Sequence, residues 1–273
     1  MLGKLIKHEF RATGRILLPL LGAELLLAVL AGFSVRGLDR VGDMGILGVM
    51  YVTTLVVFFL GLFALSVVAF VLMIQRFYKN LLRDEGYLAM TLPVAVDEHL
   101  FAKLIVSFVW FAAVGLLSVV SLLTVTSIGA RFGGVVDVDF GEVTNALKSF
   151  RTVIGGGNLL LFFLELLLMG FLGSCATCLR CYSALAIGHS AADHKMLLSF
   201  VAYIVIGFAL SVVRNSVLIG LLPSIDPGAI LAGMSSAMQF HALVFTGILA
   251  TALYCALFYF VTRWFLKNRL NLA

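Results

Sequence analysis

Charged residues are scarce in this chain of 273 residues. Asp, Glu, Lys and Arg make up 12% of it, whereas hydrophobic residues make up 62%. A water-soluble domain needs far more polar surface than this, so the composition excludes one and indicates an integral membrane protein. Because a crossing needs about 20 apolar residues, the length allows roughly six crossings in a single transmembrane domain and leaves no room for a soluble catalytic domain.

Sequence motifs of nucleotide hydrolysis and of intramembrane catalysis are also missing. The chain has no GxxxxGK[ST] phosphate-binding loop. It also lacks the NDxxD motif of prenyl transferases, the HExxH motif of zinc proteases and the GxGD motif of presenilin-like proteases. The net charge of +5 comes without a basic run or a base-stacking platform. We therefore expect no catalytic residue, no bound cofactor, no metal site and no nucleic-acid binding.

What the chain does have is six apolar runs, each long enough to cross about 30 Å of hydrocarbon as a helix. They lack the alternation of β-barrel strands, and a single segment in lipid must satisfy its own backbone groups. The predicted fold class is therefore an all-α polytopic membrane protein with six transmembrane helices. The predicted spans are residues 16–35, 46–74, 104–128, 159–179, 196–222 and 242–262.

The distribution of lysine and arginine predicts the orientation. Thirteen of these residues fall on the side that holds both termini, the connection between spans 2 and 3 and that between spans 4 and 5, against six on the other side. The excess places both termini and residues 75–103 in the cytoplasm, and the chain in a cell membrane, most simply a bacterial one. Residues 129–158 and 223–241 are then external, and 223–241 reads as re-entrant because it is too apolar for a free loop.

The first fifteen residues have the pattern of an amphipathic helix. Leu2, Leu5, Ile6 and Phe10 recur at helical spacing among basic and polar residues. We predict an interfacial helix along the inner membrane surface that leads into the first span. The alternative is a basic flanking segment that only fixes the topology.

Residues 75–103 form a charged segment between spans 2 and 3. Eight of these 29 residues are charged, and apolar residues interrupt the charges. Pro93 stops any helix before it, and Asp97 is expected to cap a new helix that runs into the third span. The segment is built like a docking element, because moving it would move both spans.

Three cysteines, Cys175, Cys178 and Cys181, lie three apart at the end of the fourth span. This spacing places them on one helical face, where small residues let helices approach. Metal or redox chemistry is the alternative, because CxxC is also the spacing of thiolate ligands. His189 and His194 follow and could contribute to such a site.

Two acids lie within predicted spans, Glu24 and Glu165. Each is costly in lipid and should face the bundle or a dimer seam. They are candidates for a polar or cation-selective substrate path, to which Phe59 and Phe63 could contribute. The alternative is a buried carboxyl bonded to a neighbouring helix. Four glycines are predicted points of close helix packing: Gly22, Gly61, Gly170 and Gly173.

Three stretches carry a resemblance to a known family. The start MLGKLIKHEFRATGRILLPL, the motif EGYLAMTLP with a lysine at the head of the third span, and YSALAIGH with a later HK resemble the membrane subunits of ABC exporters of the type-two class. The resemblance implies that the charged segment is a coupling helix seated in a cytoplasmic ATPase. The residues it assigns to this coupling are Asp84, Glu85, Gly86, Tyr87, Leu88, Thr91, Leu92 and Pro93.

The resemblance also implies a function and partners. The chain would be a permease subunit that moves a substrate outward, such as a peptide or an amphipathic compound, by alternating access. ATP and Mg²⁺ would be held by a separate ATP-binding subunit, and a second copy or a sister permease would complete the membrane part. The alternatives are a sensor or accessory subunit that moves nothing itself, and an intramembrane enzyme.

Overall fold

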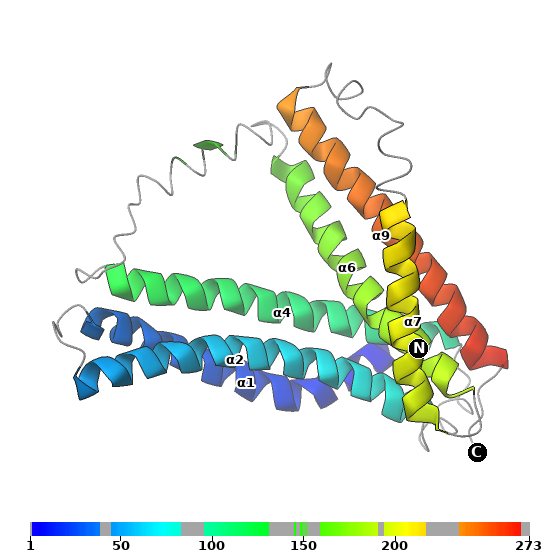
Figure 1. Ribbon diagram of the computed structural model, residues 1–273, viewed down its shortest axis with the longest axis horizontal. Coiled ribbons are helices and arrows are strands. Elements are labelled where there is room, and N and C mark those ends of the chain that lie inside the picture. The colour runs from blue at the N-terminus through cyan, green and yellow to red at the C-terminus, as the bar shows by residue number, and fades with distance from the viewer. Residues whose placement is uncertain are drawn as a thin grey trace. The chain divides into compact units, whose positions relative to one another are not determined.

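The computed structural model describes residues 2–38, 45–82, 96–130, 159–190, 194–216 and 235–268, together with residues 145, 148, 149 and 151. Every regular element within these ranges is helical. Six of the helices are long and apolar enough to cross a membrane. The predicted class, an all-α protein with six membrane-crossing helices, is thereby confirmed (Figure 1).

The helices are longer than the apolar runs that predict them, because hydropathy marks only the part suited to lipid. Helix α2 and the π-helical turn η1 that continues it cover 37 residues, or about 55 Å at the α-helical rise, against a hydrocarbon layer of about 30 Å. The elements are α1 (Leu2–Leu38), α2 (Ile46–Phe77), η1 (Tyr78–Leu82), α4 (Val96–Ala130), α6 (Leu159–Gly188), α7 (Lys195–Ser216) and α9 (Ser236–Asn268).

Several predicted boundaries need correction. Residues 1–15 and the first span are not separate elements, because one helix runs from Leu2 through Pro19 to Leu38. Residues 236–241, predicted to be external, form the first turns of α9. Residues 223–234 of that re-entrant segment and most of residues 129–158 lie outside the described residues.

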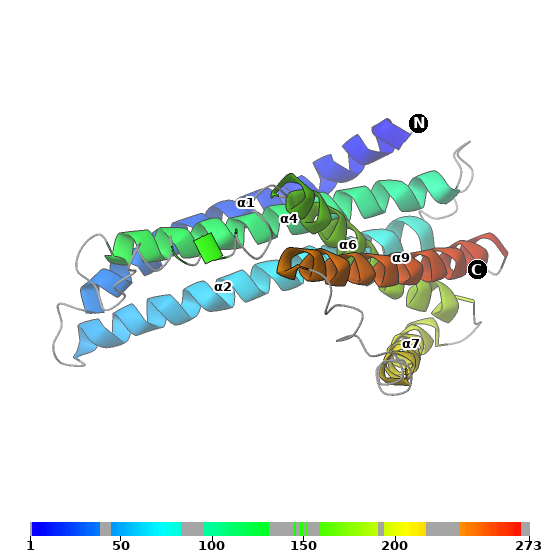
Figure 2. The ribbon, with the colours of Figure 1, turned by 90° about the horizontal axis from the view of Figure 1, so that it is seen from above.

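The chain divides into two compact units. The first comprises residues 1–73 and 105–147, and its helices α1, α2 and α4 lie side by side (Figures 1 and 2). Two apolar clusters hold them together. One contains Leu17, Leu65, Ala69, Met73, Val106, Trp110 and Val114; the other contains Ala28, Ala31 and Phe58.

The apolar side of the N-terminal part of α1 packs against the cluster that contains Trp110. Ile6 and Phe10, which the sequence assigned to the membrane surface, contact the cluster around Trp110, and the Phe10 and Trp110 ring centroids are 6.0 Å apart. Fully buried Thr13 accepts a hydrogen bond from the Trp110 indole N–H at 2.8 Å. The beginning of α1 therefore lies beside α4, and an interfacial position for the remaining side stays a prediction.

Replacing Thr13 by valine should lower the free energy of unfolding by about 1–3 kcal/mol, because the buried indole N–H of Trp110 loses its acceptor. Thr13→Ser keeps the hydroxyl and is the matched control. Thermal unfolding in detergent, followed by tryptophan fluorescence, compares the two. Equal melting temperatures for the valine and serine variants would show that the hydrogen bond contributes nothing to stability.

The second unit comprises residues 74–104 and 148–273. Helix α6 packs against both α9 and α7 (Figure 1). The Arg180 guanidinium on α6 lies over the Tyr203 ring of α7, 4.4 Å from its centroid, and Cys255 of α9 donates to the Leu172 carbonyl of α6 at 3.3 Å. The ends of α2 and α4 that flank the charged segment belong to this unit too.

Candidate functional site

The centre of the charged segment, residues 83–95, lies outside the described residues, and all eight residues that the resemblance assigns to coupling fall within it. These are Asp84, Glu85, Gly86, Tyr87, Leu88, Thr91, Leu92 and Pro93. The structure does describe both ends of the segment. The candidate site is therefore built from the contacts that hold these two ends.

The first anchor joins Phe77 and Tyr78, at the end of α2 and the start of η1, to Tyr182 of α6 and to His189, which directly follows α6. The Phe77 and Tyr182 rings are both fully buried and stack with centroids 3.9 Å apart and planes 8° from parallel. The Tyr78 ring meets His189 edge-on at 5.2 Å. The end of α2 is thus fixed to the C-terminal end of α6.

His189, which follows the last residue of α6, is held in its neutral form. Its Nδ1–H donates to the Leu185 carbonyl at 3.0 Å. Burial lowers the pKa of His189 below its ordinary value, although the bond to Leu185 opposes this shift. The edge contact with Tyr78 therefore involves an uncharged ring at neutral pH.

The second anchor is the set of contacts between Asp97 and Phe101, in the first turns of α4, and Tyr259 and Arg263 of α9. The Asp97 carboxylate accepts from the Tyr259 hydroxyl and forms an ion pair with Arg263 Nε at 3.0 Å. The Phe101 and Tyr259 rings lie 5.5 Å apart. The start of α4 is thus fixed to the C-terminal end of α9.

Lys103 links the two ends of the charged segment to each other. This lysine, at the head of the third predicted span, is buried, and its ammonium donates to the Arg76 carbonyl near the end of α2 at 3.3 Å. The π-helical turn η1 begins at Tyr78, two residues after Arg76, and such turns often occur at functional sites. The helix ends on either side of residues 83–95 are therefore tied to each other, to α6 and to α9.

The role expected for Asp97 needs correction. Asp97 lies inside the first turn of α4, which begins at Val96, so it does not stand before the helix as a cap. The helix dipole still stabilises a carboxylate at this position, but the side chains that bind the Asp97 carboxylate lie on α9. Sequence reasoning assigned Tyr259 only to a hydrophobic run and Arg263 only to the charges that set the topology, since their spacing from Asp97 carries no local signal.

Glu24 is buried between α1 and α2. Its side chain is 3% exposed, and its carboxyl fits against Gly61, where a Cβ atom would collide with Oε2. The other carboxyl oxygen, Oε1, has no hydrogen-bond partner among the described residues. The carboxyl is enclosed, but the bond to a neighbouring helix that the alternative expected is not found for Oε1 among the described residues. A role of Glu24 in a substrate path stays a prediction, and Gly61 is the glycine that makes room for its carboxyl.

Glu165 on α6 meets His241 on α9. His241 Nδ1 and Glu165 Oε2 are 2.8 Å apart, and the two side chains are 12% and 13% exposed. Phe162 and Phe240 lie beside the pair, with ring centroids 6.1 Å apart. The partner of Glu165 comes from a part of the chain that the sequence assigned to an external segment, so the pairing could not be expected from the predicted spans.

Breaking this pair from one side should cost about 3–5 kcal/mol, because the remaining partner stays buried without its counterpart. We expect this loss for Glu165→Leu and for His241→Leu, and a smaller loss than their sum for the double variant. Thermal unfolding in detergent across the four proteins measures the coupling. Additive losses would show that the two groups do not stabilise each other.

The other predicted path residues lie on outward sides of their helix. Phe59 and Phe63 are 58% and 69% exposed, whereas the neighbouring Phe58 is fully buried. Lipid or a second membrane subunit is the natural cover for such rings. Their role in a substrate path stays a prediction.

The three cysteines of α6 are buried thiols that form no disulfide among the described residues: Cys175, Cys178 and Cys181. Cys255 of α9 is also free and partly buried. Among the residues that the structure describes, no group of three or more His, Cys, Asp or Glu side chains is placed to hold a metal ion. All three cysteines of α6 are buried, which fits the predicted packing face, and the metal or redox alternative stays a prediction.

Comparison with known proteins gives no relative. No family model matches the sequence, and no curated protein or solved structure is significantly similar to it.

Proposed function

We propose that this chain is the permease subunit of an ATP-driven exporter of the ABC type, and that residues 83–95 dock onto a separate cytoplasmic ATPase subunit. The substrate, a peptide or an amphipathic compound, moves outward by alternating access. A second copy of the chain or a sister permease completes the membrane part. The proposal rests on the sequence resemblance and on the way the docking segment is held.

The observation that carries the proposal is the double anchoring of the charged segment. Phe77 and Tyr78 fix one end to α6, while Asp97 and Phe101 fix the other end to α9. A partner that pulls on residues 83–95 therefore pulls on four membrane helices together. Packed elements of this kind pass on small displacements because they shift between discrete arrangements.

In this proposal the partner subunit supplies the energy for transport. The sequence has no phosphate-binding loop of the GxxxxGK[ST] type, so the ATPase subunit supplies the binding of ATP and Mg²⁺. ATP binding draws two ATPase subunits together and carries the docking segments with them. The permease contributes the docking segment, the anchors and the bundle that rearranges.

Copurification tests the docking. The tagged chain is solubilised gently from its native membrane, and bound proteins are identified by mass spectrometry. We expect an ATPase with the wild type, and its loss with Glu85→Arg and with Tyr87→Ala. Arg151→Glu, an exposed residue on the predicted external side, is the matched control and should retain the ATPase. Recovery of no ATP-binding protein with an intact bundle would contradict the proposal.

A further inference from the structure

An exposed apolar stripe runs along α9 toward its C-terminal end. Its members recur at helical spacing and are between 49% and 66% exposed, as is typical of a face turned to lipid. They are Leu253, Leu257, Phe260 and Trp264. The stripe ends beside two cations, Arg263 and Lys267, in the last two turns of the helix.

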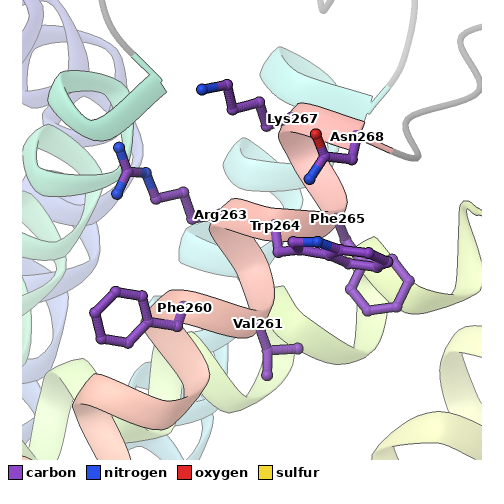
Figure 3. A pocket seen from close by; sticks show the side chains of 7 residues that line it. All are labelled: Phe260, Val261, Arg263, Trp264, Phe265, Lys267 and Asn268. Atoms are coloured by element: carbon purple, nitrogen blue, oxygen red, sulfur yellow. The ribbon is translucent and has the colours of Figure 1, made fainter.

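The two cations border a depression of about 460 Å³ on the end of α9. Figure 3 shows Arg263 and Lys267 extending along one side of it and the Trp264 and Phe265 rings along the other. Asn268 lies at its end. Among the described residues that line the depression none is acidic, and the Asp97 carboxylate reaches Arg263 from outside this lining. The depression therefore combines an apolar floor with two cationic side chains and an amide.

Both cations have donors left for a ligand. Arg263 uses Nε for Asp97, and the terminal nitrogens of its guanidinium are not engaged by any interaction found among the described residues. Lys267 is exposed, and no partner for it is found there either. The two residues are one turn apart on the helix, about 6 Å along its axis, so one phosphate group is within reach of both side chains.

We propose that the C-terminal end of α9 binds an anionic phospholipid of the surrounding leaflet. Arg263 and Lys267 hold the headgroup phosphate, since a guanidinium matches phosphate in a bidentate way. The acyl chains lie along Phe260, Leu257 and Leu253. Trp264 sits at the boundary, where the amphipathic indole ring is favoured. Charge complementarity and the continuous apolar stripe point to a lipid, because a soluble phosphate would bind the two cations without contacting the apolar stripe.

Quenching of Trp264 by brominated lipid tests the site in the full chain. The protein is placed in phosphatidylcholine vesicles that contain the same small fraction of either brominated phosphatidylglycerol or brominated phosphatidylcholine. The chain has two tryptophans, and Trp110 is buried, so quenching reports mainly on Trp264. Trp264→Phe identifies the part of the signal that belongs to this residue.

We expect stronger quenching by the anionic lipid, and a roughly fivefold weaker preference in Lys267→Ala, the effect of about 1 kcal/mol per cation near the surface. Lys7→Ala, which removes another exposed lysine, should keep the full preference. Equal quenching by the two lipids, or an unchanged preference in Lys267→Ala, would overturn the proposal. So would loss of the preference on adding soluble glycerol 3-phosphate, since a free phosphate would then be the ligand.

Discussion

Tyr182→Ala should lower the free energy of unfolding by about 3–5 kcal/mol, the range for deleting a buried aromatic side chain. Tyr182 is fully buried, and its ring stacks on Phe77 at 3.9 Å. The truncation leaves a cavity and releases the end of α2 from α6 at the same time. Thermal unfolding in detergent is the measurement.

Two further variants separate the ring of Tyr182 from general effects of mutation. Tyr182→Phe keeps the stacked ring and should lose much less stability than Tyr182→Ala. Phe163→Ala removes an aromatic ring of the same helix that is 61% exposed, and should change stability little. If Phe163→Ala is as destabilising as Tyr182→Ala, the stacked rings of the first anchor contribute no more to the free energy of unfolding than an exposed ring does.

Gly61→Ala should destabilise the first unit by about 1–3 kcal/mol, the usual cost of overpacking a core. The added methyl group would meet the Glu24 carboxyl with no space between them. Gly22→Ala is the matched control, because a Cβ atom there has no neighbour within 4 Å. That change should be neutral or stabilising by about 0.5–1 kcal/mol, the advantage of alanine over glycine inside a helix.

Removing the carboxyl should relieve the collision. Glu24→Ala combined with Gly61→Ala is expected to be more stable than the sum of the two single changes predicts, because each variant makes room for the other. Melting temperatures of the four proteins give the coupling. Additive effects would mean that the Glu24 carboxyl does not rest against Gly61.

The sequence predicts the membrane helices well, because each needs only a local run of apolar residues. The ends of the helices are predicted poorly, since polar turns beyond the hydrocarbon layer carry no hydropathy signal. Helix α2 with η1 therefore reaches Leu82, well beyond residue 74. The same limit hid the continuity of α1 from Leu2 to Leu38. The start of α4 at Val96 agrees with the helix expected to begin near Asp97 and run into the third span, because an acidic residue after a proline does mark a helix start in the sequence.

Contacts between residues far apart in the sequence could not be predicted from local patterns. Of the four glycines expected at close contacts, Gly61 meets a neighbour, whereas Gly22, Gly170 and Gly173 have none within 4 Å among the described residues. A glycine in a membrane helix permits close approach, but only the partner helix decides where it occurs. The pairs of Glu165 with His241 and of Asp97 with Arg263 likewise join residues 76 and 166 positions apart, which no local pattern reveals.

The docking segment connects the sequence resemblance with the structure. The sequence supplies the motif EGYLAMTLP, and the structure supplies the anchors on either side of it. Neither alone identifies the partner. The proposed function requires residues 83–95 to touch an ATPase in the cell.

The most direct measurement is photo-crosslinking from Tyr87 in the native membrane. A photoreactive phenylalanine analogue replaces Tyr87, and in a second protein it replaces the exposed Arg151 on the predicted external side. After irradiation, the crosslinked partners are identified by mass spectrometry. We predict that Tyr87 captures a protein with a GxxxxGK[ST] phosphate-binding loop and that Arg151 does not. Crosslinks from Tyr87 to lipid, to this chain alone, or to a partner without such a loop would contradict the docking of this chain on an ATPase.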